Sequence, residues 1–106
     1  MSKAVLKKIT TNEEIEIIIP KMIIGRVVSE KNRPIIDYSI ESNSMISRFH
    51  AVITFKNNDY YLIDCGALNK TQLNGVDLEV NCEYLLHNDD VLKFANEKYQ
   101  FKRIEV

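Results

Sequence analysis

The feature of this sequence that most constrains its fold is a series of short apolar runs separated by turn-forming residues. No segment keeps apolar residues at the 3.6-residue period of a helix over ten positions. In the second run, the spacing places Ile15, Ile17 and Ile19 on one face and Glu14 and Glu16 on the other, which is the period of a half-buried strand. About ten such runs, with turns every six to twelve residues or so, predict an all-β sandwich or barrel.

The boundaries of these runs give the strands that we expect. They cover residues 4–9, 13–19, 22–25, 35–40, 50–56, 60–64, 76–80, 83–86, 91–95 and 98–104. Pro20 closes the second run, because proline cannot donate to a sheet ladder. Asn74 and Gly75 both tolerate positive φ and lie between short apolar runs, so they predict a tight hairpin.

Length, charge and cysteine content narrow the classes of function. A chain of 106 residues suits one domain, over residues 1–106, and is too short for two. A formal net charge of −1 gives no reason to expect nucleic acid or a membrane as partner. The sequence has no apolar run near about 18 residues and no leader-like start, so we expect a cytoplasmic location. Cys65 and Cys82 lack metal-ligand spacing, so we expect no metal or other cofactor.

One predicted hairpin brings two polar segments together. The runs 50–56 and 60–64, joined by a turn at 57–59, would place Ser47 and Asn69 at the same edge of a sheet. Both segments carry hydroxyl and amide groups, and one carries an arginine. These groups suit the recognition of an anion or of a peptide backbone.

Four segments together resemble the forkhead-associated (FHA) domain. They are Ile24-Gly25-Arg26, Ser47-Arg48-Phe49-His50-Ala51, Asn69-Lys70-Thr71-Gln72-Leu73-Asn74-Gly75 and the tail 85–92. The resemblance covers roughly residues 22–103. It implies a sandwich of two antiparallel sheets, with about ten to eleven short strands and with binding loops at one end. It also implies a non-enzymatic domain that binds phosphothreonine in an extended peptide.

The resemblance also assigns roles to individual residues. Arg26 and Ser47 are expected to contact the phosphate, and an arginine suits this because its planar fork donates two parallel hydrogen bonds. Arg48 either adds a donor to the ligand or forms a structural ion pair. Asn69 is expected to bind the ligand's backbone. The full expected binding set is Arg26, Ser47, Arg48, Asn69 and Lys70, with structural support from Gly25, His50, Thr71, Asn74 and Gly75. The expected partner is a phosphothreonine-containing protein, and a kinase of the same pathway is a further partner.

The sequence departs from the FHA pattern at three places. Lys70 stands where the family usually has glycine, which implies strain or a changed loop. Leu68 replaces a small hydroxyl residue that often contacts phosphate, and the segment 88–90 lacks the usual glycine. The changes at Leu68 and Lys70 motivate a rival interpretation, in which an FHA-like domain binds its partner through a sheet face without phosphate.

An enzyme or a metal protein has less support. Cys65 directly follows Asp64, so their side chains would point to opposite faces of a strand and could not form a triad with His50. The acidic turn 87–90 offers three potential metal ligands without a second ligand cluster. The resemblance makes His50 a buried, hydrogen-bonded support of the binding loop.

Overall fold

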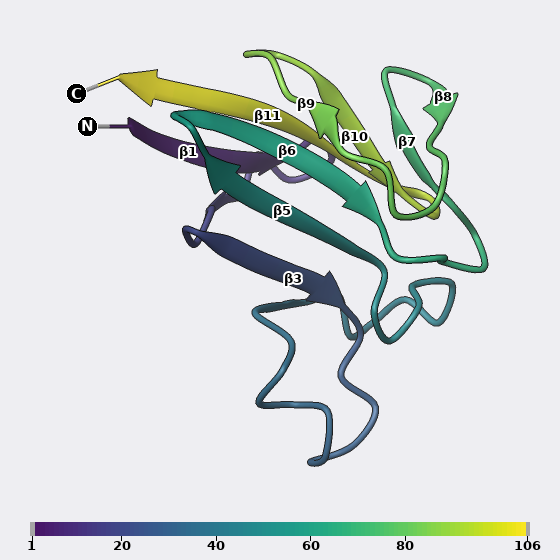
Figure 1. Ribbon diagram of the computed structural model, residues 1–106. Coiled ribbons are helices and arrows are strands. Elements are labelled where there is room, and N and C mark those ends of the chain that lie inside the picture. The colour runs from purple at the N-terminus through teal and green to yellow at the C-terminus, as the bar shows by residue number, and fades with distance from the viewer. Residues whose placement is uncertain (1, 106) are drawn as a thin grey trace.

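A computed structural model describes residues 2–105, apart from the side chains of the two end residues. These residues form eleven strands and no helix: β1 (Ser2–Lys8), β2 (Glu14–Glu16), β3 (Lys21–Gly25), β4 (Tyr38–Ser39), β5 (Ala51–Lys56), β6 (Asp59–Asp64), β7 (Thr71–Leu73), β8 (Val76–Asp77), β9 (Tyr84–Leu85), β10 (Val91–Phe94) and β11 (Glu97–Glu105). One sheet has the order β2-β1-β11-β10-β7-β8 and the other the order β4-β3-β5-β6-β9. The two sheets form a sandwich (Figure 1), which confirms the predicted fold class.

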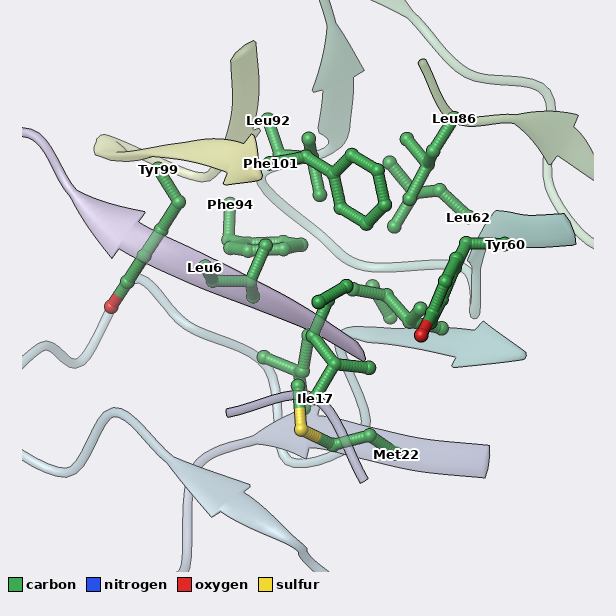
Figure 2. Close-up of a cluster of buried hydrophobic side chains, with 14 of the residues drawn as sticks. Leu6, Ile17, Met22, Tyr60, Leu62, Leu86, Leu92, Phe94, Tyr99 and Phe101 are labelled. Carbon is green, nitrogen blue, oxygen red and sulfur yellow. The ribbon is translucent and has the colours of Figure 1, made fainter. Parts of the chain in front are cut away.

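Alternation along the longer strands creates the core between the sheets. Tyr60 and Leu62 of β6 are buried on one side of the core, and Leu92 and Phe94 of β10 are buried on the other (Figure 2). Aromatic rings meet across the interface, with 5.4 Å between the ring centroids of Tyr60 and Phe101. Each fully buried large apolar side chain contributes about 1.5–3 kcal/mol relative to an exposed one. The core therefore fixes how the two sheets, and the loops that leave them, are placed.

The second predicted strand is shorter than expected. β2 ends at Glu16, and only Ile17 of the three residues that follow is buried. Ile18 and Ile19 are exposed, so the prediction that Ile19 shares a buried face with Ile15 and Ile17 is wrong. The chain has to turn toward β3 before Pro20, and this turn ends the alternation.

Two other segments also differ from the predicted strands. Within 35–40, only Tyr38 and Ser39 form a strand, and they pair in parallel with β3. β7 (Thr71–Leu73) was not predicted as a strand, since three residues are too few to show a period. It pairs with β10 on one side and with β8 on the other. Asn74 and Gly75 join β7 to β8 with φ of 50° and 84°, which confirms the predicted hairpin turn.

The loops that follow β3 and β6 leave the sandwich at the same end. In Figure 1, β3 and β6 run toward the same end, where the segments 26–50 and 65–70 leave the sheets. Ser2 and Glu105 pair with each other at the other end. The described residues contain no helix of the length and apolarity that crossing a membrane requires.

Candidate functional site

Arg26 leaves the end of β3 at a point where two backbone segments touch. A Cβ at Gly25 would lie 1.9 Å from the carbonyl oxygen of Arg48, so only glycine fits there. The Arg26 N–H donates to that same Arg48 carbonyl at 3.3 Å, and Arg26 Nε donates to the Ile46 carbonyl at 2.8 Å. Both the backbone and the base of the guanidinium of Arg26 are therefore fixed against the segment 46–48.

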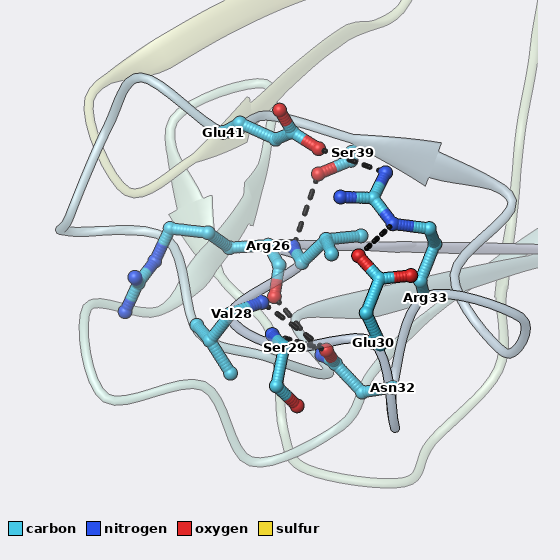
Figure 3. Close-up of polar contacts among 9 residues, drawn as sticks. Arg26, Val28, Ser29, Glu30, Asn32, Arg33, Ser39 and Glu41 are labelled. Atoms are coloured by element: carbon cyan, nitrogen blue, oxygen red, sulfur yellow. Dashed lines mark hydrogen bonds and ion pairs between the residues drawn. The ribbon is translucent and has the colours of Figure 1, made fainter.

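The outer nitrogens of Arg26 remain available. Among residues 2–105 no group forms a hydrogen bond or an ion pair with Nη1 or Nη2. Figure 3 shows the guanidinium pointing away from the nearby ion pairs, in which Arg33 contacts Glu30 and Glu41. Asn32 steadies the chain after Arg26 by donating to the Arg26 carbonyl at 3.1 Å. The arrangement presents two donors of one planar fork to solvent.

Ser47 connects the two loops that the predicted hairpin brings together. Its Oγ accepts a hydrogen bond from the Leu68 N–H at 3.1 Å, and its own N–H donates to His50 Nδ1 at 3.1 Å. No residue within 2–105 accepts the Ser47 hydroxyl proton. Since the oxygen is already held by an N–H, the hydroxyl is oriented and can donate to a ligand.

His50 is buried and connects both loops from beneath. Because Nδ1 accepts from Ser47, the ring proton lies on Nε2, which donates to the Lys70 carbonyl at 2.8 Å. The ring meets Phe94 edge to face, with 5.9 Å between centroids. Burial lowers the pKa of His50, while the bond to Lys70 and the nearby Asp64 act in the opposite direction. A neutral imidazole thus holds the Ser47 and Lys70 backbones at a fixed separation.

Asn69 and Lys70 lie in the second loop. Asn69 Nδ2 donates to the Met45 carbonyl at 2.9 Å, which leaves its Oδ1 without a hydrogen-bonded partner in the described part of the chain. Lys70 takes φ of 65°, the conformation of the glycine that usually stands there, and its carbonyl also accepts the Ala95 N–H at 3.1 Å. The loop therefore keeps its left-handed residue, and the exposed lysine adds a cation.

Asp64 supports this loop through buried hydrogen bonds. Thr71 Oγ1 donates to Asp64 Oδ1 at 2.6 Å, and the Gly66 N–H donates to Oδ2 at 3.0 Å. From the sequence, Asp64 was considered only as a member of a triad with His50 and Cys65. However, an acid followed two residues later by glycine is a common local turn signal. Cys65, next to it, has its pKa raised by burial and by the charge of Asp64, which disfavours a thiolate nucleophile.

Asn43, which no sequence pattern identified, fixes the 41–46 loop. Asn43 Nδ2 donates to Glu97 Oε2 at 2.9 Å, and Asn43 Oδ1 accepts the Met45 N–H at 3.0 Å. Glu97 lies in β11 and also pairs with Lys8 at 3.3 Å. The loop that carries the Met45 and Ile46 carbonyls is therefore anchored to the six-stranded sheet.

The structure thus brings the expected binding residues to one end of the sandwich. Two of the expected supporting residues, Asn74 and Gly75, lie away from this end. Arg48 is exposed, and it makes no ion pair within the described residues. Leu68 projects fully into solvent, with 85% of its surface exposed. Asn74 and Gly75 lie at the far end of β7 from Lys70, where Asn74 Oδ1 accepts the Val91 N–H at 2.9 Å. The described residues hold no cluster of potential metal ligands.

A two-sheet sandwich with cations, amides and a hydroxyl on loops at one end defines a class of loop-binding β domains. The FHA domain model matches residues 22–95, and the chain therefore belongs to the FHA domain family. No match was found among curated protein sequences.

Solved structures share the fold. The chain superposes on EmbR of Mycobacterium tuberculosis, solved with a low-affinity phosphopeptide, with a TM-score of 0.81 and 19% identity; the match covers 94% of this chain and 24% of EmbR. The FHA domain of the CT664 protein from Chlamydia trachomatis gives a TM-score of 0.78 at 21% identity, covering 94% of this chain and 96% of that one. The MEK1 FHA domain, solved with a HOP1 phosphothreonine peptide, gives 0.73 at 27% identity, covering 93% and 94%.

Proposed function

We propose that this chain is a phosphothreonine-dependent protein-interaction domain that binds an extended phosphopeptide through the loops at one end of its sandwich. The observation that carries the proposal is the combination of Arg26 and Ser47. Each is fixed by backbone hydrogen bonds, and each keeps donors that no group within residues 2–105 takes up. The structure of the MEK1 FHA domain with a phosphothreonine peptide supports the same use of this fold.

The chemistry of the ligand matches these donors. A phosphothreonine carries a charge of about −1.5 to −2 and three strong acceptor oxygens. The Arg26 fork and the Ser47 hydroxyl supply directed donors, and Arg48 and Lys70 supply exposed cations beside them. Asn69 Oδ1 is free among the described residues to accept a peptide N–H of the ligand. Two or three charged hydrogen bonds, less the ordering of a peptide, predict a dissociation constant on the order of micromolar.

The proposal includes the setting of the domain. Residues 1–106 form a single non-enzymatic domain without a cofactor, located in the cytoplasm. Its partner is a protein phosphorylated on threonine, and the kinase that phosphorylates the partner acts in the same pathway.

The test is an NMR titration of the isotope-labelled protein with a degenerate phosphothreonine peptide library. Unphosphorylated, phosphoserine and aspartate libraries are titrated in parallel. We expect the signals of Arg26, Ser47 and Asn69 to move with phosphothreonine only. Arg26→Ala and Ser47→Ala should each weaken binding by about ten-fold or more, because each removes a hydrogen bond to a charged group.

Arg33→Ala is the matched control, because it removes an arginine of the same loop whose charge is already paired with Glu30 and Glu41. It should bind as the unmodified protein does. If no phosphopeptide moves the three signals in a folded protein, or if Arg33→Ala weakens binding as much as Arg26→Ala, the proposal is wrong.

A phosphate-independent interaction through a sheet face is the second candidate, and one observation favours it. The outward face of the five-stranded sheet carries an apolar cross-strand row of Ile23, Val52 and Ile63. Tyr61 and Leu85 pair beside them. This candidate predicts that Arg26→Ala leaves partner binding intact, whereas Ile63→Glu on the sheet face abolishes it.

A further inference from the structure

The outward face of the six-stranded sheet carries an unusual number of lysines. The strand register places Lys3 and Lys7 of β1 on the same face as Lys98 and Lys102 of β11 and Lys93 of β10. Their neighbours in each strand, such as Leu92 and Phe101, point into the core instead. A row of cations on one face attracts anions unless acidic side chains neutralise it.

Most of these lysines have an acidic neighbour. Lys3 pairs with Glu16 at 3.4 Å, and Lys102 forms an ion pair with Asp89. Lys7 lies directly opposite Glu14 in the register of β1 and β2. The charge of this part of the face is therefore balanced within the chain.

Lys93 and Lys98 are the exception. They are direct cross-strand partners in the hairpin of β10 and β11, so their Cβ atoms are about 4.5–5.5 Å apart. Neither makes an ion pair with any acidic residue of the described chain. Like charges directly opposite each other destabilise a sheet, so this pair costs stability without compensation from the chain.

The two lysines also line a hollow. It has a volume of about 290 Å³ and is lined by Gln72, Asn74, Gly75, Val91, Lys93 and Lys98. Gln72 Nε2 already donates to Asp77 Oδ1 at 2.8 Å, and Asn74 Nδ2 donates to Asp90 Oδ1 at 3.0 Å. The Asp77 and Asp90 carboxylates are thus each held by an amide of the lining, and the two ammonium groups are the charged donors of the hollow.

We infer that this hollow is a second binding site, which docks an acidic segment of a protein partner through carboxylates of Asp or Glu. An ammonium is a point charge that accepts carboxylates from several directions, whereas phosphate sites favour the arginine fork, which this hollow lacks. The outward positions of β1, β10 and β11 within the described residues carry no aromatic ring. Single-stranded nucleic acids bind by stacking on such rings, so they fit poorly here.

The site is separate from the loop end and does not depend on the proposed phosphothreonine recognition. Gln72 lies on the sheet face two residues beyond Lys70, about 7 Å along the strand direction. An acidic stretch of a partner can therefore bind here alone, or a partner bound at the loops can continue onto this face.

The first arm of the test is an NMR titration with an unphosphorylated peptide of alternating Asp and Glu. We expect the signals of Gln72, Lys93 and Lys98 to move, while those of Ser47 and Asn69 stay in place. Raising the salt to about 0.5 M should abolish the shifts, since exposed charges are then screened. If the peptide moves no signal of the hollow at low salt, or moves only the loop signals, the inference is wrong.

The second arm uses the double variant Lys93→Gln with Lys98→Gln. It should weaken binding of the acidic peptide about four- to twenty-fold, which corresponds to the loss of two exposed ion pairs. The matched control is Lys21→Gln with Lys56→Gln, which removes the same charge from the five-stranded sheet. Equal weakening by the two variants would mean that total charge alone attracts the peptide, and it would overturn the inference. Phosphothreonine binding by the same variants reports separately on the loop site.

Discussion

At the scale of single residues, the least expected feature is Lys70 in a left-handed conformation. Its φ of 65° is unfavourable for a residue with a Cβ, by roughly 1–2 kcal/mol. The loop holds it there because its carbonyl accepts hydrogen bonds from both His50 and Ala95. The chain therefore keeps a cation beside the site at a cost in stability.

Replacing Lys70 measures that cost. Lys70→Gly should raise the free energy of unfolding by about 0.5–1 kcal/mol, because the strain is relieved and part of the gain is lost to the entropy of glycine in the unfolded chain. Chemical denaturation measures the change. Lys70→Ala removes the same charge but keeps a Cβ at positive φ, so it should bring no such gain. Equal stability of the two variants would contradict this explanation.

Residue-level features were predictable only where a local pattern identifies them. The tight turn at Asn74 and Gly75 followed from two residues that tolerate positive φ. Asn32 and Asn43 could not be found in this way, because only folding brings their partners, the Arg26 carbonyl and the Glu97 carboxylate, to them. For example, Asn43 reaches Glu97, which is 54 positions away.

At the scale of elements, the 41–46 loop depends on its anchor to β11. Asn43→Ala removes the bonds to Glu97 and to the Met45 N–H, so the loop should become mobile. We expect faster amide hydrogen exchange across residues 43–47 and a three- to ten-fold or so weaker binding of the phosphothreonine peptide, because the loop must then be ordered on binding.

Ser44→Ala is the matched control for this loop. Ser44 is exposed, and its side chain makes no hydrogen bond within residues 2–105. The variant should leave exchange and binding unchanged. If amide hydrogen exchange across residues 43–47 were unchanged in Asn43→Ala, the backbone hydrogen bonds would hold the loop without the Asn43 side chain, and the prediction would be wrong.

Elements were predictable in proportion to their length. The hairpin of β5 and β6 was expected from alternation over five to seven residues, and it brings Ser47 into contact with Leu68 in the opposite loop. β4 and β8 have two residues each, and no period can show in so short a strand. Ile19 looked like a core residue because the pattern continued past the point where the chain turns.

At the scale of the whole molecule, stability should depend on the protonation of His50. Burial lowers the pKa of His50 below its ordinary value of 6.5. At a pH between the lowered pKa of His50 in the folded chain and its ordinary pKa in the unfolded chain, only the unfolded chain binds the proton. The free energy of unfolding therefore falls as the pH is lowered from about 7 toward 5. At a pH above the ordinary pKa, His50 is neutral in both the folded and the unfolded chain, and its full contribution to the free energy of unfolding is present.

The chain has only two histidines, which gives this prediction an internal control. Denaturation across the same pH range should show a flatter dependence in His50→Gln. The variant His87→Gln changes an exposed ring and should keep the dependence of the unmodified protein. If both variants keep it, the loss of stability comes from carboxylates elsewhere.

The outermost strands of both sheets are very short. β2 has three residues, and β8, β4 and β9 have two each, whereas the long strands lie inside the sheets. A sheet edge recruits a neighbouring chain by offering a row of unpaired N–H and C=O groups, and an edge of two or three residues offers almost none. The domain therefore offers few unpaired backbone groups to a strand of another chain, so a high concentration of the protein should not seed fibrils. Its partners must be recognised by side chains, which mutation can retune one residue at a time.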